Sequence, residues 1–219
     1  MRRTLLTYCI LIGTLFSCST KTQQEEMGIF DRFKKEKPVA SNEMMDEEQF
    51  WSIIKTAKQG SKDFDEYVPN ITNALSRLSS TDIIGFYLRE QKLRFDSYNS
   101  DLWCAAYIMN GGCSDDCFEY FRCWIIAQGK DVFYKAIKTP DSLVDYYSKE
   151  IEFYEFEDMM YVASEAFEKK TGKDIEDYVD YDVFKTNEAH YPDFEFTWEE
   201  DSEESMKAVC PNLMKIAWN

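Results

Sequence analysis

The sequence contains one histidine and few basic residues relative to acidic ones. His190 is the only histidine among 219 residues, and 25 lysines and arginines face 41 aspartates and glutamates, which gives a net charge of −16. Proteins that bind nucleic acid neutralise phosphates with lysine and arginine, so this balance argues against a nucleic-acid partner. No serine or cysteine stands at a spacing from His190 that indicates a nucleophile–base pair. We expect His190 to be a surface or structural residue.

The motifs of cofactor-dependent and metal-dependent enzymes are absent from the sequence as well. The chain contains no Walker loop, no dinucleotide-binding fingerprint, no HExxH and no GxSxG. The acidic residues from Asp174 to Asp182 lack the spacing of aspartates and glycine in a calcium loop. The sequence therefore predicts no cofactor and no metal, and it leaves open whether the chain is an enzyme.

Long hydrophobic runs are missing except near the N-terminus. The run that follows Arg2 and Arg3 is too short for a comfortable membrane span. A positively charged start followed by a short apolar stretch is typical of a signal peptide, which we place at residues 1–17. An N-terminal anchor that is not cleaved is the alternative, and both interpretations place the chain at a membrane.

The signal peptide ends in Leu15-Phe16-Ser17-Cys18, which resembles the lipobox of bacterial lipoproteins, although Phe16 is bulkier than the usual residue. The resemblance implies cleavage before Cys18, a diacylglyceryl thioether on its sulfur and a further acyl chain, such as palmitate, on the new N-terminus. Ser19 follows the cysteine, which by analogy with lipoprotein sorting favours the outer membrane. We therefore expect a protein of the bacterial cell envelope that is anchored to the membrane through Cys18.

Two regions follow the signal peptide. Residues 18–45 are polar and mixed in charge, which predicts a flexible tether. Residues 46–219 are long enough for one hydrophobic core, and their aromatic and apolar content is typical of a globular domain. Loss of Arg2 and Arg3 would leave 23 basic residues against 41 acidic ones, a net charge of −18, whose simplest role is solubility.

The sequence predicts a mostly α, single domain of about eight to ten helices around a central αα-hairpin within Ser97–Lys130. Ser100 is the expected N-cap of the first hairpin helix, and Ser114 that of the second. Asn110-Gly111-Gly112 separates them, since glycine adopts the left-handed conformation that ends helices. On the second helix we expect Asp115, Glu119 and Arg122 to form a polar face.

Capping and breaking residues predict the remaining elements. The expected helices begin at Asp46, Pro69, Ser79, Asp131 and Thr139. The longest helix is expected over Phe153–Lys170, and a last one starts near Asp201 and is broken by Pro211. Apolar and polar residues alternate over Phe194–Trp198, which makes a single short strand possible there.

Five cysteines remain once Cys9 is removed with the signal peptide and Cys18 is lipidated; they are Cys104, Cys113, Cys117, Cys123 and Cys210. Five is an odd number, so at least one thiol has no partner within the chain. Cys117 and Cys123 face different sides of one helix, which argues against a zinc site. A Cys113–Cys117 disulfide is feasible in an oxidising envelope, and burial as small apolar residues is the alternative for most of them.

Asp115, Asp116, Glu119 and Arg122 are the candidate catalytic residues. Clustered carboxylates beside a helix start form acid–base sites in some enzymes. Helix capping and an ion pair between residues three positions apart explain the same pattern without any catalysis.

Several segments resemble a bacterial family catalogued as domain of unknown function 4240. They are Met45–Trp51, Ile84-Gly85-Phe86, Asn110-Gly111-Gly112-Cys113-Ser114-Asp115-Asp116, Phe118–Arg122, Trp124-Ile125 and Gln128-Gly129, within about Met45–Ile175. The family usually has glycine where this chain has Cys117 and Cys123. The resemblance implies a mostly helical domain and assigns no activity and no catalytic residues.

The leading hypothesis is a lipid-anchored envelope protein whose helical domain is a binding or interaction module, with the membrane and a protein as partners. The first alternative is an enzyme with a carboxylate-based site near Asp115–Arg122. The second is an immunity-type protein whose acidic surface blocks a basic toxin.

Overall fold

The computed structural model of the chain describes residues 35–180 and 192–218. Contacts between Cα atoms divide the chain into Met1–Lys35 and a compact unit, Glu36–Asn219. The predicted signal peptide, Cys18, most of the predicted tether and His190 lie outside the described residues. The described helices and the four candidate catalytic residues belong to the compact unit.

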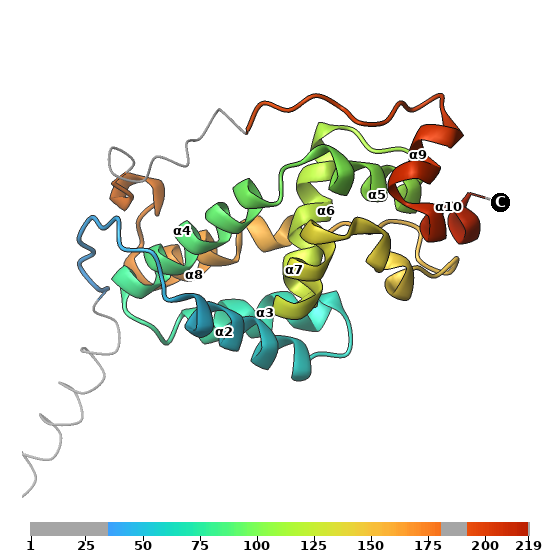
Figure 1. The fold of residues 1–219 in the computed structure, drawn as a ribbon. Helices are drawn as coiled ribbons and strands as arrows, with labels where there is room; N and C mark the ends of the chain where they lie inside the picture. The colour runs from blue at the N-terminus through green and yellow to red at the C-terminus, as the bar shows by residue number, and fades with distance from the viewer. Residues whose placement is uncertain (1–34, 181–191, 219) are drawn as a thin grey trace, which may run out of the picture. The chain divides into compact units, whose positions relative to one another are not determined.

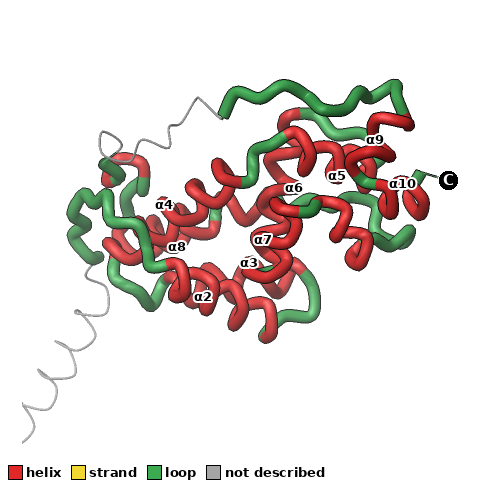
Figure 2. The backbone as a smooth tube through the Cα atoms, in the orientation of Figure 1, coloured by secondary structure: helices red, strands yellow, loops and turns green. Residues whose placement is uncertain are grey.

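The fold is mostly helical, as predicted, and its described residues contain nine α-helices, three 3-10 helices and no strand (Figures 1 and 2). A single parallel bridge joins Ser41 to Val179 in these residues. The elements are α2 (Glu47–Gln59), α3 (Phe64–Leu75), α4 (Ser80–Asp96), α5 (Ser100–Asn110), α6 (Asp115–Gln128), α7 (Lys130–Lys138), η1 (Pro140–Tyr146), η2 (Glu157–Met160), α8 (Val162–Thr171), η3 (Glu176–Tyr178), α9 (Glu203–Val209) and α10 (Pro211–Ala217).

Helices α5 and α6 form the predicted hairpin at the centre of the unit. Gly111 ends α5 in the left-handed conformation with φ 68°, and the Ser114 side chain caps α6 by accepting from the Cys117 N–H. Helix α6 packs against α2, α4, α5 and α7, and it crosses the middle of the unit in Figure 1. Seven of the eleven residues of α5 are completely or almost completely buried apolar residues, which explains why the sequence of this helix is apolar on every face.

Capping residues set most helix starts where the sequence places them. Asp46 and Ser79 cap α2 and α4 through their side chains. The prediction for α5 is wrong by one residue, because Asn99 is the N-cap and accepts from the Leu102 N–H. Ser100 is already helical, and its hydroxyl accepts from the Thr197 N–H at 2.9 Å instead. A contact with the distant C-terminal segment therefore occupies the predicted capping group.

The expected helix start at Pro69 is also wrong. Helix α3 begins at Phe64, and the Asp63 side chain caps it by accepting from the Glu66 N–H at 3.0 Å. The buried stripe Tyr67, Ile71 and Leu75 continues past Pro69 without a break. Burial of this stripe and a capped first turn outweigh the cost of one proline within the helix.

The helix expected over Phe153–Lys170 is not the longest and does not begin there. Helix α4 is the longest of the described helices with 17 residues, and α8 begins only at Val162. The Tyr154 N–H donates to the Asn110 side chain at 2.7 Å, and the Phe156 N–H donates to the Tyr120 carbonyl at 3.0 Å. These bonds to the central hairpin replace the helical ones, so the segment before η2 is irregular.

The C-terminal segment differs in one further respect from the expectation. Residues 192–198 form no strand and lie against α5, where Trp198 Nε1 donates to the Ser100 carbonyl at 2.9 Å. Helix α9 begins after its cap Ser202, and Pro211 starts α10, as the predicted break implies. No helix in the described part of the chain is both long and apolar enough to span a membrane.

Candidate functional site

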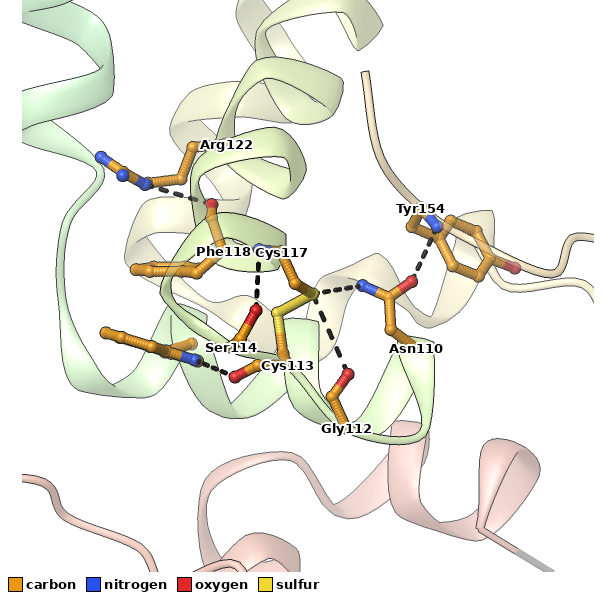
Figure 3. Close-up of a disulfide and its surroundings, with 9 residues drawn as sticks. Asn110, Gly112, Cys113, Ser114, Cys117, Phe118, Arg122 and Tyr154 are labelled. Carbon is orange, nitrogen blue, oxygen red and sulfur yellow. Dashed lines mark hydrogen bonds between the residues drawn. A yellow bond between two sulfur atoms is a disulfide. The ribbon is translucent and has the colours of Figure 1, made fainter. Parts of the chain in front are cut away.

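The turn of the hairpin is held by side chains of the Asn-Gly-Gly-Cys-Ser segment (Figure 3). The Asn110 side-chain oxygen Oδ1 accepts from the Tyr154 N–H at 2.7 Å, and its side-chain nitrogen Nδ2 lies 3.4 Å from the Cys117 sulfur. Gly112, like Gly111, has a positive φ, at 136°, which favours glycine. Asn110 therefore links the turn both to the irregular segment before η2 and to the start of α6, which gives a structural reason for this residue pattern.

Cys113 and Cys117 form a disulfide across the start of α6. In Figure 3, this disulfide lies between the side chain of Ser114, which caps the helix, and that of Asn110 of α5. This disulfide is the one that the sequence makes feasible. The other three cysteines of the domain, Cys104, Cys123 and Cys210, are free and buried, as the alternative interpretation of small apolar residues predicts.

The four candidate catalytic residues divide into two pairs. Asp115 and Asp116 are exposed in the first turn of α6, where the helix dipole favours acidic side chains. Arg122 is only 1% exposed, so the expected polar face of α6 does not include it. Its guanidinium lies 5.0 Å from the Tyr98 ring centre and 4.9 Å from that of Phe118. Glu119 lies beside it and turns towards α4.

Glu119 and Arg122 belong to a buried network of four charges between α4 and α6. Arg122 Nη2 donates to Glu119 Oε2 at 2.5 Å, and Arg94 donates to the other oxygen of that carboxylate. Arg94 also pairs with Glu90, whose carboxylate oxygen lies 2.6 Å from Arg94 Nε. Two carboxylates and two guanidinium groups thus form a chain with no net charge. Buried charges need this kind of pairing, because leaving one without a partner is very costly.

Burial dominates the electrostatics of this network. It raises the pKa of Glu90, although Arg94 beside it acts in the opposite direction. Burial also raises the pKa of the Cys123 thiol well above its usual value, and its sulfur lies 4.0 Å from a Glu90 oxygen. A thiol with a raised pKa is a poor nucleophile. The geometry therefore supports a structural role for the network, which joins α4 to α6.

A pocket of about 330 Å³ opens where α2, α3 and the end of α6 meet. Lys58 Nζ donates to the Gln128 side-chain oxygen at 2.7 Å and to the Gln128 carbonyl at 3.0 Å. Partial burial of this ammonium lowers the pKa of Lys58, even though much of its side chain reaches solvent. The pocket is lined by Lys58, Ser61, Lys62, Asp63, Phe64, Tyr67 and Gln128.

Aromatic side chains form the apolar part of this pocket. Phe64 stacks on Phe156 with 4.4 Å between ring centres, and 38% of its surface remains exposed. Tyr67 is buried, and its hydroxyl contacts the carbonyl oxygens of Ile54 at 3.3 Å and Ala127 at 3.1 Å. The sequence did not predict this pocket, because Lys58 and Gln128 lie on different helices and no local pattern joins them.

Metal-binding groups do not gather anywhere in the described residues. Across 35–180 and 192–218, no three histidine, cysteine, aspartate or glutamate side chains are arranged to hold a metal ion.

Comparison with known proteins gives a family and no activity. Residues 45–169 match the model of a family described as protein of unknown function (DUF4240). Neither a curated protein nor a solved structure matches the chain. The matched range begins at the residue where the sequence resemblance begins, and it includes the hairpin, the buried charge network and every residue that lines the pocket. It covers more than half of the 219 residues, so this chain belongs to the DUF4240 family of proteins of unknown function.

Proposed function

We propose that this chain is a lipid-anchored protein of the bacterial cell envelope whose helical domain binds a small organic anion. The sequence of residues 1–18 supports the anchor, since a positive start and a short apolar run precede a cysteine in a lipobox-like context. Several acyl chains on one residue hold a protein at a membrane far more firmly than a single chain does. The domain would then act at the membrane surface.

The pocket at Lys58 is the observation that carries the binding role. Its volume of about 330 Å³ lies near the lower end of the ~300–1,000 Å³ range of small-molecule sites. Lys58 supplies a cation whose N–H groups contact only one neighbouring residue among the described hydrogen bonds. An ammonium has three donors, so it can bond an anionic ligand while it keeps its contacts with Gln128.

The chemistry of the walls narrows the ligand class. Phe64 and Tyr67 offer aromatic surface to the pocket, and Lys58 offers positive charge. A carboxylate with an aromatic or aliphatic body satisfies both, because its charge meets the ammonium and its body covers the exposed part of Phe64. An anion near Lys58 would also offset the partial burial that lowers the pKa of this ammonium.

The ligand proposal is tested with 3-phenylpropanoate and with its amide, 3-phenylpropanamide, as the neutral analogue. We expect ligand-observed NMR to detect the carboxylate and not the amide, and Lys58→Met to weaken carboxylate binding about tenfold or more, since a charged hydrogen bond contributes ~1.5–3 kcal/mol. Lys55→Met is the matched control, because Lys55 is exposed on the same helix and does not line the pocket. Equal binding of acid and amide, or an equal loss in both variants, would contradict the proposal.

The anchor is tested separately with a palmitate analogue that carries an alkyne. We expect the wild-type protein to incorporate the label and to sediment with membranes, and Cys18→Ser to lose the label. Cys123→Ala serves as the control for cysteine loss. A labelled Cys18→Ser protein would refute lipidation at this residue, and an unlabelled wild type that still sediments with membranes would indicate the uncleaved anchor instead.

A further inference from the structure

Two of the three free cysteines lie in elements that pack against each other. Cys104 is in α5, and Cys210 lies between α9 and α10 at the other end of the domain sequence. Both side chains are completely buried, and α9 and α10 both pack against α5. The neighbouring Cys104 side chain and burial raise the pKa of the Cys210 thiol. The third free cysteine, Cys123, lies beside Glu90 in the charge network. The folded chain therefore brings together elements that carry two buried thiols far apart in sequence.

Hydrogen bonds on the N-terminal side of Cys210 fix the C-terminal segment on α5. Thr197 donates its N–H to Ser100 Oγ at 2.9 Å, and its hydroxyl donates to an Asp101 carboxylate oxygen at 2.7 Å. Trp198 adds a bond from its indole N–H to the Ser100 carbonyl at 2.9 Å. Cys104 lies one helical turn after Ser100, on the same side of α5. The face of α5 that carries Cys104 is thus the face that this segment covers.

A second set of bonds fixes the chain immediately after Cys210. The Asp141 carboxylate in η1 accepts from the backbone N–H groups of Asn212 and Leu213, each at 2.9 Å, and from the Asn212 side chain at 2.6 Å. These bonds anchor the first turn of α10, and α10 packs against both η1 and α5. The position of Cys210 is therefore determined from both sides, and the elements on either side of it pack against the helix that carries Cys104.

We propose that Cys104 and Cys210 form a second disulfide, which fastens the C-terminal segment 192–218 to the family domain. The match to the family model ends at residue 169, so Cys210 belongs to a part of the chain beyond that model. The bond also completes the pairing of the five cysteines that follow Cys18. Cys113 pairs with Cys117, Cys104 pairs with Cys210, and Cys123 remains a buried thiol.

The oxidation proceeds by thiol–disulfide exchange with a disulfide-containing oxidant. One thiolate of the pair attacks the oxidant and forms a mixed disulfide, with release of one oxidant thiol. The second thiolate then attacks the mixed disulfide, which forms the Cys104–Cys210 bond and releases the other oxidant thiol. The chain loses two protons and two electrons, and the oxidant gains them. Because both thiols are buried in the folded domain, exchange takes place while residues 192–218 are docking on α5.

The test uses the full chain refolded from its reduced, denatured state in a mixture of reduced and oxidised glutathione. A protease recognition sequence is inserted between Lys185 and Thr186, so that cleavage separates Cys104 from Cys210 and leaves Cys113 and Cys117 on one fragment. We expect the two fragments to migrate together on a denaturing gel without reductant and to separate completely after reduction. Cys210→Ser should separate without reductant, whereas the control Cys123→Ala should stay joined.

Peptide mapping of the chain without the insertion gives a second measurement that does not depend on the inserted site. Thiols are blocked with an alkylating agent during denaturation, and we expect a linked Cys104–Cys210 peptide together with an alkylated Cys123. Fragments that separate without reductant in the wild type, or alkylated Cys104 and Cys210, would overturn the proposal. The glutathione supplies the oxidant, so the result is independent of the proposed export to the envelope.

Discussion

Replacement of Arg122 by methionine tests the role of the buried charge network. Methionine keeps an unbranched apolar stem of similar volume and removes the guanidinium, which lies against the Tyr98 and Phe118 rings. The variant leaves Glu90, Arg94 and Glu119 in place, which gives the buried network a net charge of −1 in place of zero. An unbalanced buried charge is the main source of the expected loss.

The surroundings of Arg122 set the size of this loss. Removal of one partner from a buried ion pair costs ~3–5 kcal/mol of unfolding free energy. Glu119 keeps its bond from Arg94, and the Arg94 carbonyl, which accepts from Arg122 Nη1 at 2.7 Å, still accepts from Ser97 Oγ at 3.0 Å. Both of these acceptors therefore keep a hydrogen-bond partner, so we expect a loss at the lower end of this range, about 3 kcal/mol of unfolding free energy. The lost contacts with the two rings are included in this figure.

Urea denaturation followed by tryptophan fluorescence measures the effect. With an m-value of about 2 kcal/mol per molar urea, a loss of about 3 kcal/mol lowers the unfolding midpoint by about 1.5 M. Lys135→Met is the control, since Lys135 pairs with Asp145 at 3.4 Å with both side chains largely exposed. An exposed pair of this kind contributes ~0–1 kcal/mol.

The double variant Glu119→Gln, Arg122→Met separates charge imbalance from lost packing. It leaves the neutral Glu90–Arg94 pair and removes both other charges. We expect it to be more stable than Arg122→Met alone. The reasoning is refuted if Arg122→Met is as stable as Lys135→Met, or if the second substitution makes the first one worse.

The close contact at Gly85 and the lowered pKa of Lys58 give two further predictions. Gly85→Ala should lower the free energy of unfolding by ~1–3 kcal/mol, because an added Cβ would lie 3.0 Å from both the Glu43 carbonyl oxygen and the Met45 nitrogen. The control Gly60→Ala should be tolerated, since the atom nearest to its added Cβ is 3.5 Å away. Equal urea midpoints for the two variants would contradict this prediction. The affinity for 3-phenylpropanoate should be constant near neutral pH, because only the ammonium form of Lys58 attracts the anion. It should weaken as the pH rises through the lowered pKa of Lys58, below the ordinary lysine value of 10.5. An NMR titration that shows constant affinity up to pH 10.5 would exclude Lys58 as the partner.

Local patterns in the sequence predicted the helical class and the central hairpin. The caps Asp46, Ser79 and Ser114, and the glycine that ends α5, act through bonds to residues within a few positions. Such interactions are encoded in the local sequence and hold in most contexts. The Cys113–Cys117 disulfide was predictable for the same reason, because the two cysteines flank one helical turn.

Tertiary contacts decided the features that the sequence misplaced. The Ser100 hydroxyl has the chemistry of a helix cap, but it accepts from the Thr197 N–H instead. The segment before η2 is not helical, because its backbone N–H groups donate to Asn110 and Tyr120. Arg122 stands at a position in the helical pattern that predicts a polar, exposed face, yet it is buried against α4. Its neighbour Glu119 forms an ion pair with Arg94 of α4. The Glu90–Arg94 spacing of four residues and the Glu119–Arg122 spacing of three were the local signs of this network.

By itself, the sequence determined the helical class, the hairpin and its turn, because these depend on capping, glycine conformation and apolar periodicity over short distances. The proposed lipid anchor also rests on local sequence alone. Only the tertiary structure decided that Lys58 meets Gln128 at a pocket, that four charges from two helices neutralise one another, and that α9 and α10 cover the helix that carries Cys104. Each of these joins residues far apart along the chain, and no periodicity within a single helix specifies which distant side chain will pack against it.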